Sequence, residues 1–275
     1  SLPSILPPMT RSEALETTKI YSISGLLPKE TPMMASRPFR APHYTISNAG
    51  LVGGGSWPRP GEVSLSHRGV LFLDELPEFG QPRLELLRQP IEDKIVNISR
   101  VRGTVSFPCN FMLVGAMNPC PCGFYNDPVK YCSCSPGAIL RYQQRLSGPF
   151  TDRMDIFVNV PHVNYDKLTS NQSGESSLSV QKRVAEARNI QLNRFHNRLR
   201  IANAEMKPHE IKEFCITDET AQNLLKEAMR QLHLSARAYH RILKLGRTIA
   251  DLDDSETIKA YHVAEAIQYR PRLFS

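Results

Sequence analysis

The stretch GVLFLDE at residues 69–75 decides the fold that we expect for this chain. Four consecutive apolar residues between a glycine and two acids form the pattern of a strand buried on both faces. Such strands occur in parallel sheets covered by helices, where ligands bind at the carboxyl ends of the strands. Asp74 and Glu75 follow the strand at that end. One carboxylate there can hold Mg²⁺ bound to a nucleotide and the other can polarise the attacking water, as in a Walker B motif. The alternative is a core strand that runs into an acidic turn.

Other strand patterns surround this stretch. Residues 111–117 (FMLVGAM) indicate a second buried strand, and residues 155–160 (DIFVNV) a third. Alternating residues at 94–100 and 103–107 predict a β-hairpin. Together these patterns indicate an α/β part over residues 1–160.

The second part of the chain shows a different pattern. Residues 161–177 are polar and rich in Ser and Asn, which is typical of a linker. No strand pattern follows, and the part from 178 to 275 is expected to be all-helical, with Asp218 and Ser235 as N-caps. The expected helices are 178–199, 208–213, 218–233, 235–252 and 259–270.

Composition limits the class of protein. The chain has 275 residues, of which 41% are hydrophobic and 22% charged, with a net charge of +7 that permits a nucleic-acid partner. No apolar run approaches the roughly 20 residues that span a bilayer, and no signal-peptide pattern occurs, so we expect no membrane association. Six cysteines, four of them close together, favour a metal site in a reducing compartment, the cytoplasm, over a secreted disulfide framework.

The four clustered cysteines are Cys120, Cys122, Cys132 and Cys134. Four thiolates in two C-x-C pairs can complete a tetrahedral Zn²⁺ site, and the intervening Gly123 and Asn126-Asp127-Pro128 supply a turn that can bring the pairs together. Such zinc would brace a loop and take no part in catalysis. Free or redox-active thiols and an iron–sulfur cluster are the alternatives, because C-x-C is less typical of zinc than C-x-x-C.

Asn118 follows the second buried strand directly. An amide both donates and accepts hydrogen bonds, so this side chain could orient the lytic water against a γ-phosphate. Its alternative role is an Asn-Pro turn that ends the strand.

Arg153 lies shortly before the third expected strand. An arginine at a subunit edge can reach the γ-phosphate bound by a neighbouring subunit and stabilise transition-state charge, as arginine fingers do. A salt bridge with Asp152 or Asp155 is the alternative. Arg141 and Arg145 are reserve candidates for the same role.

Arg237 occupies the first turn of an expected helix, where a basic residue opposes the helix dipole. An anionic partner explains this placement, and that partner is either a phosphate or a surface acid such as Asp251.

Basic residues on the expected hairpin could contact DNA. Arg100 and Arg102 stand at its tip and Lys94 stands lower, where they could bind backbone phosphates without reading sequence. A solvated hairpin without a partner is the alternative. Trp57 and Arg59 form an aromatic and basic loop that could stack on bases, or could equally be a mobile loop.

Taken together, these motifs resemble the Mg-chelatase-like AAA+ ATPase family, over nearly the whole chain. The resemblance rests on RPFRAPHYTISNAGLVGGG (37–55), PRPGEVSLSHRGVLFLDELPEF (58–79), NPCPCG (118–123), SGPFTDRMDI (147–156) and LSARAYHRILKLGRTIADL (234–252).

The resemblance implies an AAA+ parallel-sheet sandwich with β-hairpin inserts, followed by a helical lid. It implies that Asp74 and Glu75 form the Walker B motif, that Asn118 is sensor 1, and that Arg153 and Arg237 are the arginine finger and sensor 2. Members of the family include hexameric DNA helicases that promote branch migration during natural transformation, and ATP with Mg²⁺ would be hydrolysed between subunits. Magnesium-chelatase subunits instead remodel a protein partner, which is the second hypothesis. A zinc-braced interaction module without ATPase activity is the third.

One departure from the family is large. No glycine is followed by lysine, so the phosphate-binding motif G-x-x-x-x-G-K-[ST] is absent from this sequence. In family members that P-loop lies just before the residues that correspond to 1–9 of this sequence. A Lon-protease-like domain precedes the P-loop. We therefore expect this chain to be a fragment with little or no nucleotide affinity of its own. A smaller departure is Tyr44, where the family often has a second histidine.

Overall fold

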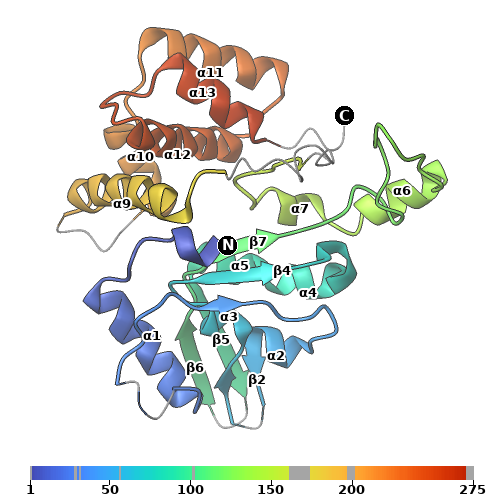
Figure 1. The fold of residues 1–275 in the computed structure, drawn as a ribbon, viewed down its shortest axis with the longest axis vertical. Helices are drawn as coiled ribbons and strands as arrows, with labels where there is room; N and C mark the ends of the chain where they lie inside the picture. Colours follow the sequence, from blue (N-terminus) through green and yellow to red (C-terminus); the bar gives the residue numbers. More distant parts are fainter. Residues whose placement is uncertain are drawn as a thin grey trace. The chain divides into compact units, whose positions relative to one another are not determined.

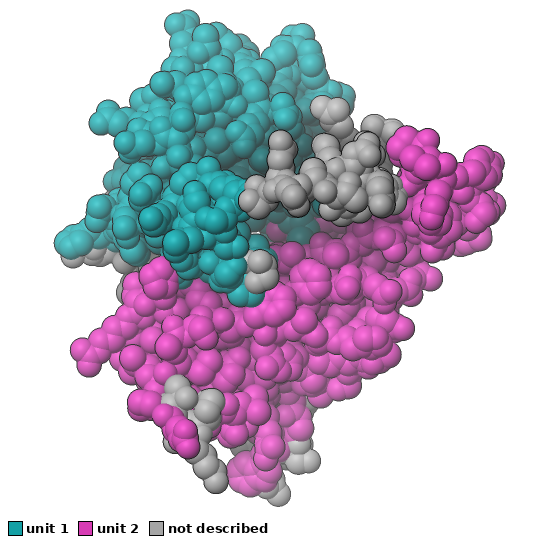
Figure 2. All heavy atoms as spheres, viewed as in Figure 1, with its two compact units in different colours: residues 1–7, 154–275 teal, residues 8–153 magenta. Residues whose placement is uncertain are grey.

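The protein is described from a computed structural model of the 275-residue chain. The structure divides into two compact units (Figure 2), which we call the α/β unit (residues 8–153) and the helical unit (residues 1–7 and 154–275). The division falls after residue 153, whereas the sequence placed it after residue 160, and most of the expected linker lies outside the described residues. The structure describes residues 2–27, 30, 32–55, 57–100, 103–160, 174–196 and 202–270.

A three-stranded parallel sheet forms the centre of the α/β unit (Figure 1). Its strands are β1 (Phe39–Arg40), β4 (Val70–Leu73) and β7 (Met112–Gly115), in the order β1-β4-β7. Three of the four β4 side chains have no exposed surface, as the apolar run predicted. The predicted strands at 70–73 and 111–117 are therefore confirmed, and they are direct neighbours in the sheet.

The segments before, between and after the strands of this unit form helices, most of them short. They are α1 (Arg11–Ile23), α2 (Asn48–Val52), α3 (Glu62–Leu65), η2 (Leu76–Phe79), α4 (Gly80–Leu86), α5 (Arg88–Asp93), α6 (Pro136–Gln143) and α7 (Gly148–Thr151). Phe79, the last residue of η2, which follows the acidic pair directly, is fully buried. The segment after β4 is thus held by packing.

Two antiparallel hairpins belong to the α/β unit, formed by β2 (Gly53–Gly54) with β3 (Arg59–Pro60) and by β5 (Ile95–Arg100) with β6 (Gly103–Pro108). The second is the hairpin that the alternating residues predicted. The hairpins pack against each other so closely that a Cβ on Gly53 would lie 2.6 Å from Cδ1 of Ile98. Glycine is required there, and it also adopts a φ of 105°.

The third expected strand does not form. None of the residues 155–160 is in a strand, and within the described part of the chain Phe157 N donates to Tyr269 O at 2.9 Å. Alternating apolar residues form a strand only when a neighbouring strand supplies hydrogen bonds along the ladder, and the helical unit offers these residues a helix end instead.

The helical unit follows the predicted pattern closely. Asp218 accepts a hydrogen bond from Ala221 N at 2.7 Å and Ser235 accepts one from Ala238 N at 3.2 Å, so both predicted N-caps are confirmed. None of the described helices combines the length and apolarity needed to cross a membrane. The elements are η1 (Leu2–Ile5), α9 (Ser177–Arg194), η3 (Asn203–Glu205), α10 (Pro208–Phe214), α11 (Glu219–Gln231), α12 (Ala236–Leu252) and α13 (Ala260–Gln268).

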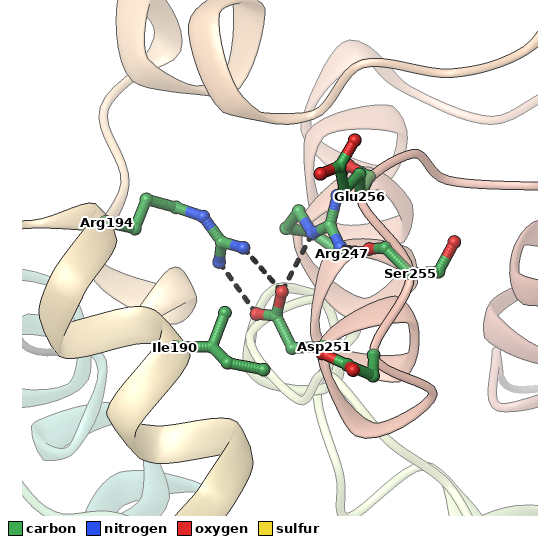
Figure 3. Close-up of a pocket in the computed structure, with 7 residues that line it drawn as sticks. Ile190, Arg194, Arg247, Asp251, Ser255 and Glu256 are labelled. Carbon is green, nitrogen blue, oxygen red and sulfur yellow. Dashed lines mark hydrogen bonds and ion pairs between the residues drawn. The ribbon is translucent and has the colours of Figure 1, made fainter.

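A buried ion network joins α9 to α12 and to the loop after α12 (Figure 3). The carboxylate of Asp251, which has no exposed side-chain surface, accepts hydrogen bonds from Arg194 at 2.7 Å and from Arg247 Nε at 3.0 Å. Arg247 also donates to the backbone oxygen of Glu256 at 2.6 Å, and Asn203 donates to Asp251 at 2.7 Å. Every charge in the network therefore has a partner, as buried charges require.

A second, partly buried network holds α1 against the turn before β4. His67, 3% exposed, accepts a hydrogen bond at Nδ1 from Asn110 N at 3.0 Å, so its proton lies on Nε2, 3.1 Å from the Glu16 carboxylate. Burial, assisted by the charge of Arg68, lowers the pKa of His67 although Glu16 opposes this shift. For Glu16, burial raises the pKa, but hydrogen bonds from Arg68 and His67 outweigh it and the pKa is lowered.

We expect Asp251→Ala to destabilise the protein by about 3–5 kcal/mol, because it leaves two buried guanidinium groups without their carboxylate. Urea unfolding followed by circular dichroism measures the loss. The matched control is Glu227→Ala, which removes an exposed carboxylate 3.7 Å from Arg230 and should cost less than about 1 kcal/mol. Equal losses for the two variants would show that the network does not stabilise the helical unit.

We expect stability to fall as the pH falls from about 6.5, because the unfolded chain then binds a proton at His67 that the folded state, with its lowered pKa, does not. A further loss follows below 4.5, where Glu16 becomes protonated in the unfolded chain first. Urea midpoints between about pH 8 and pH 4 measure both steps. His67→Gln should remove the first step and leave the second; a variant with the native profile would contradict this assignment.

Candidate functional site

The acidic pair lies at the carboxyl end of β4, and both side chains are exposed. The Glu75 backbone is left-handed, with φ 50° and ψ 45°, and its N–H donates to Asp74 Oδ1 at 2.9 Å. A left-handed conformation is costly for a residue with a Cβ and persists only where surrounding contacts hold it. Here Leu76 N donates to Ala116 O at 2.9 Å and fixes the turn against the segment after β7.

Asn118 lies at the same edge of the sheet. The pairing of β4 with β7 sets Leu73 opposite Gly115, and the ladder continues one step further through Ala116 N to Leu73 O at 2.9 Å. Asn118, which is exposed, follows two residues later. The fold therefore brings the predicted carboxylates and the predicted amide to one edge from positions more than forty residues apart.

A glycine makes this close arrangement possible. A Cβ on Gly115 would lie 2.8 Å from Cδ2 of Leu76, a side chain that is only 5% exposed. The turn that carries the acids can therefore lie directly on the end of β7 only because residue 115 has no side chain. Two exposed carboxylates and an amide oxygen are hard ligands suited to Mg²⁺, which retains several of its waters when bound to proteins.

Arg153 forms an ion pair with Glu92, whereas the sequence suggested Asp152 or Asp155. Its guanidinium lies 3.0 Å from the carboxylate of Glu92 at the end of α5, and its side chain is 9% exposed. Burial lowers the pKa of this guanidinium, and the nearby charge of Arg88 acts in the same direction. Asp155 instead pairs with Arg241 at 2.6 Å.

The two reserve arginines lie on or near α6. Arg145 forms an ion pair with Glu78, and both side chains are more than 40% exposed. Arg141 is exposed on α6. Both remain accessible from solvent, whereas Arg153 is largely covered.

Arg237 is exposed in the first turn of α12, in the helical unit. The acid considered as its partner, Asp251, belongs instead to the buried network with Arg194 and Arg247. The spacing of Arg247 and Asp251, four residues apart on one helix, was the signal in the sequence for that pair.

The pocket of about 280 Å³ in the helical unit (Figure 3) is lined by this same network. Its arginines and Asp251 bind one another and backbone carbonyls, including that of Ser255, which Arg247 contacts. These charges are already satisfied within the protein, so we assign the pocket a structural role. Sequence reasoning did not identify it, because α9 and α12 are far apart along the chain.

The basic hairpin is only partly described. Lys94 ends α5 with a left-handed backbone at φ 59° and is half-buried at the base of β5. The backbone of Arg100 forms the end of β5, and Arg102 lies outside the described residues. On the neighbouring hairpin, the indole of Trp57 is 69% exposed and Arg59 is exposed.

The four clustered cysteines converge, and their sulfur atoms all lie within 4.8 Å of one another. The Sγ atoms of Cys120 and Cys122 are 3.4 Å apart, and those of Cys122 and Cys132 are 3.5 Å apart. A hydrogen bond from the backbone of Phe124 is the main cause that lowers the pKa of Cys122 to about 6. A group of thiols this close, one of them readily ionised, could bind a metal ion.

Comparison with known proteins places the chain among relatives of similar sequence. The family model described as magnesium chelatase, subunit ChlI, matches residues 1–168, and the model of the ChlI C-terminal part matches residues 174–270. The chain is 44% identical over 272 residues to competence protein ComM of Haemophilus influenzae, covering 98% of this chain and 52% of that protein. It is 41% identical over 270 residues to the uncharacterized protein YifB of Salmonella typhimurium, again covering 98% and 52%.

The uncharacterized protein Rv2897c of Mycobacterium tuberculosis is 39% identical over 270 residues, with 98% of this chain and 53% of that protein covered. The chain thus spans about half the length of the curated relatives that it matches. The parallel sheet with its many helices is consistent with an AAA+-like fold. Both family models together cover most of the sequence, and the chain therefore belongs to the Mg-chelatase-like (ChlI) family that contains ComM and YifB.

Proposed function

We propose that this chain is the motor part of a hexameric AAA+ ATPase that moves branched DNA. The observation that carries the proposal is the convergence of Asp74, Glu75 and Asn118 at one edge of the parallel sheet, in the unit that also bears the basic hairpin. A relative that is 44% identical over 272 residues is named competence protein ComM, and that name favours DNA as the substrate.

The residues of this chain divide the work of hydrolysis. Asp74 would hold the Mg²⁺ that accompanies ATP and neutralises its charge. Glu75 would accept a proton from the attacking water, and the Asn118 amide would hold that water in line with the γ-phosphate. This sequence contains no G-x-x-x-x-G-K-[ST] motif to cradle the phosphates of ATP, so we expect weak nucleotide binding by this chain alone.

The arginines would act between subunits. Arg237 would contact the phosphates from the helical unit, and Arg153 would stabilise the charge that develops on a neighbour's γ-phosphate. In that role Arg153 must exchange its contact with Glu92, 3.0 Å away, for the phosphate. Arg141 or Arg145, which are accessible, would serve if that exchange does not occur.

The hairpin tips would contact DNA. Arg100, Arg102 and Lys94 supply positive charge for backbone phosphates, and the exposed indole of Trp57 offers a stacking surface on the adjacent hairpin. Hydrolysis would move these tips along the DNA.

The four cysteines would hold Zn²⁺ as a structural ion, since soft thiolates prefer it and leave no position for substrate. Reduced thiols of this kind suit a cytoplasmic protein. A chelatase-type ATPase that remodels a protein partner is the second candidate, favoured by the description of the matching family model. A zinc-braced module without ATPase activity is the third, although it leaves the acidic edge unexplained.

In a protein that carries this sequence together with an upstream P-loop, we expect Glu75→Gln to reduce ATP hydrolysis by about 10²-fold or more, because the amide cannot accept the proton from water. Migration of a Holliday junction should stop with it. The matched control is Glu78→Gln, which changes an exposed acid three residues further that pairs with Arg145. Junction migration at the native rate in the Glu75→Gln protein would disprove the proposed mechanism.

Replacing both Arg100 and Arg102 with Ala should weaken DNA binding and reduce the slope of log K against log salt by about 2, because two phosphate contacts are lost. Fluorescence anisotropy over a salt series measures this slope. The control replaces Lys212 and Lys226, two exposed lysines of the helical unit, and removes the same charge. An unchanged slope in the hairpin variant would favour the partner-remodelling enzyme over the DNA motor.

A further inference from the structure

The segment from Asn118 to Ser135 joins β7 to α6 without a helix or strand of its own. Its apolar side chains contribute little to a core, because Val129 is 82% exposed and Tyr131 is 94% exposed. A segment of this length with so few buried contacts needs another source of order. The four cysteines, whose sulfur atoms lie close together, are the feature of this segment that could supply that order.

The sulfur atoms match the shape of a closed tetrahedral metal site. With metal–sulfur distances of about 2.3 Å, a tetrahedron of four thiolates has edges of roughly 3.8 Å. The measured separations approach that value: 3.4 Å between Cys120 and Cys122, 3.7 Å between Cys120 and Cys132, and 3.5 Å between Cys122 and Cys132. The Cys134 sulfur lies within 4.8 Å of the other three. No pair of these cysteines forms a disulfide.

The main chain around the cluster donates hydrogen bonds to its sulfur atoms. The sulfur of Cys122 accepts a hydrogen bond from the backbone N–H of Phe124, that of Cys132 from Cys134, and that of Cys134 from Cys122. Hydrogen bonds from N–H groups stabilise the negative charge that metal ligands carry. The bond from the backbone of Cys122 to the sulfur of Cys134 joins the two C-x-C pairs.

The cluster is tied directly to Asn118. Cys120, which is fully buried, lies two residues after Asn118, and Gly123 N donates to Cys120 O at 3.0 Å. On the other side, Gln143 of α6 donates to Pro119 O at 3.2 Å. The backbone of Asn118 is thus held between the end of β7, the cysteine cluster and α6.

We propose that the four cysteines bind a Zn²⁺ ion and that this ion fixes the position of Asn118. The ion would close the loop after β7 and so hold the amide at the sheet edge, opposite Asp74 and Glu75. Four thiolates fill the coordination of the ion, so it contacts neither water nor substrate. The part of this inference that concerns ATP hydrolysis rests on the proposed function, whereas the metal site and its effect on the backbone do not.

Two measurements on the whole protein test the proposal without using activity. Cobalt(II) added to metal-free protein should give the intense visible bands of tetrahedral thiolate coordination, at one equivalent per chain. Hydrogen exchange followed by mass spectrometry should then show the backbone N–H groups within residues 116–120 (all except Pro119, which has none) exchanging about tenfold faster without metal. Readdition of Zn²⁺ should restore their protection, which separates loss of metal from irreversible unfolding. Exchange in the β5–β6 hairpin should not change.

Variants supply the controls. Cys132→Ser should lose the metal, the visible bands and the protection of residues 116–120. Cys109→Ser removes a buried thiol outside the cluster and should keep all three. If Cys132→Ser does not fold, removal of zinc from the native protein with a chelator gives the same comparison.

The outcomes are distinct. Cobalt spectra without thiolate bands would overturn the metal site, and bound metal without any effect on residues 116–120 would overturn the positioning role. Metal-dependent protection in a protein whose Glu75→Gln variant still drives junction migration would uphold this inference and disprove the proposed function instead.

Discussion

The parallel pairing of β4 with β7 is the constraint on which the candidate site depends. Its register sets Leu73 opposite Gly115 and thereby brings the acidic pair and Asn118 to the same edge of the sheet. The turn after β4 fits there because Gly115 presents no side chain to Leu76. Because the side-chain period of a strand is two, a slip of one residue would turn every β4 side chain to the opposite face of the sheet and disrupt its packing. Burial of β4 therefore also protects the geometry of the site.

The two arginines proposed to contact phosphate, Arg153 and Arg237, depend on which anion they pair with. Their candidate roles concern phosphate bound between subunits, yet within this chain Arg153 is already paired with Glu92 and largely covered. Arg237 is exposed and belongs to the other unit. An arginine cannot lose its charge at ordinary pH, so a contact with phosphate must be made by exchanging one anionic partner for another. In the hexamer that we propose, the γ-phosphate bound by a neighbouring subunit would be the competing anion.

In both units, networks of charged and polar side chains help to hold the helices and turns together. In the helical unit the carboxylate of Asp251 holds two helices together through Arg194 and Arg247. In the α/β unit His67 and Glu16 connect α1 to the turn before β4. Such groups are stable in the interior only when each donor and acceptor is matched, and they therefore specify one arrangement of the elements that they join.

The sequence by itself determined the features that depend on neighbouring residues. The apolar run of β4, the alternation of the β5–β6 hairpin and the caps at Asp218 and Ser235 act within a few residues, so their patterns were sufficient. The C-x-C spacing likewise indicated the cysteine cluster. Tertiary structure alone decided that residues 155–160 lack a strand partner and that Arg153 pairs with Glu92. Ladder hydrogen bonds and ion pairs join segments distant in the chain, and local pattern carries no information about which segments meet.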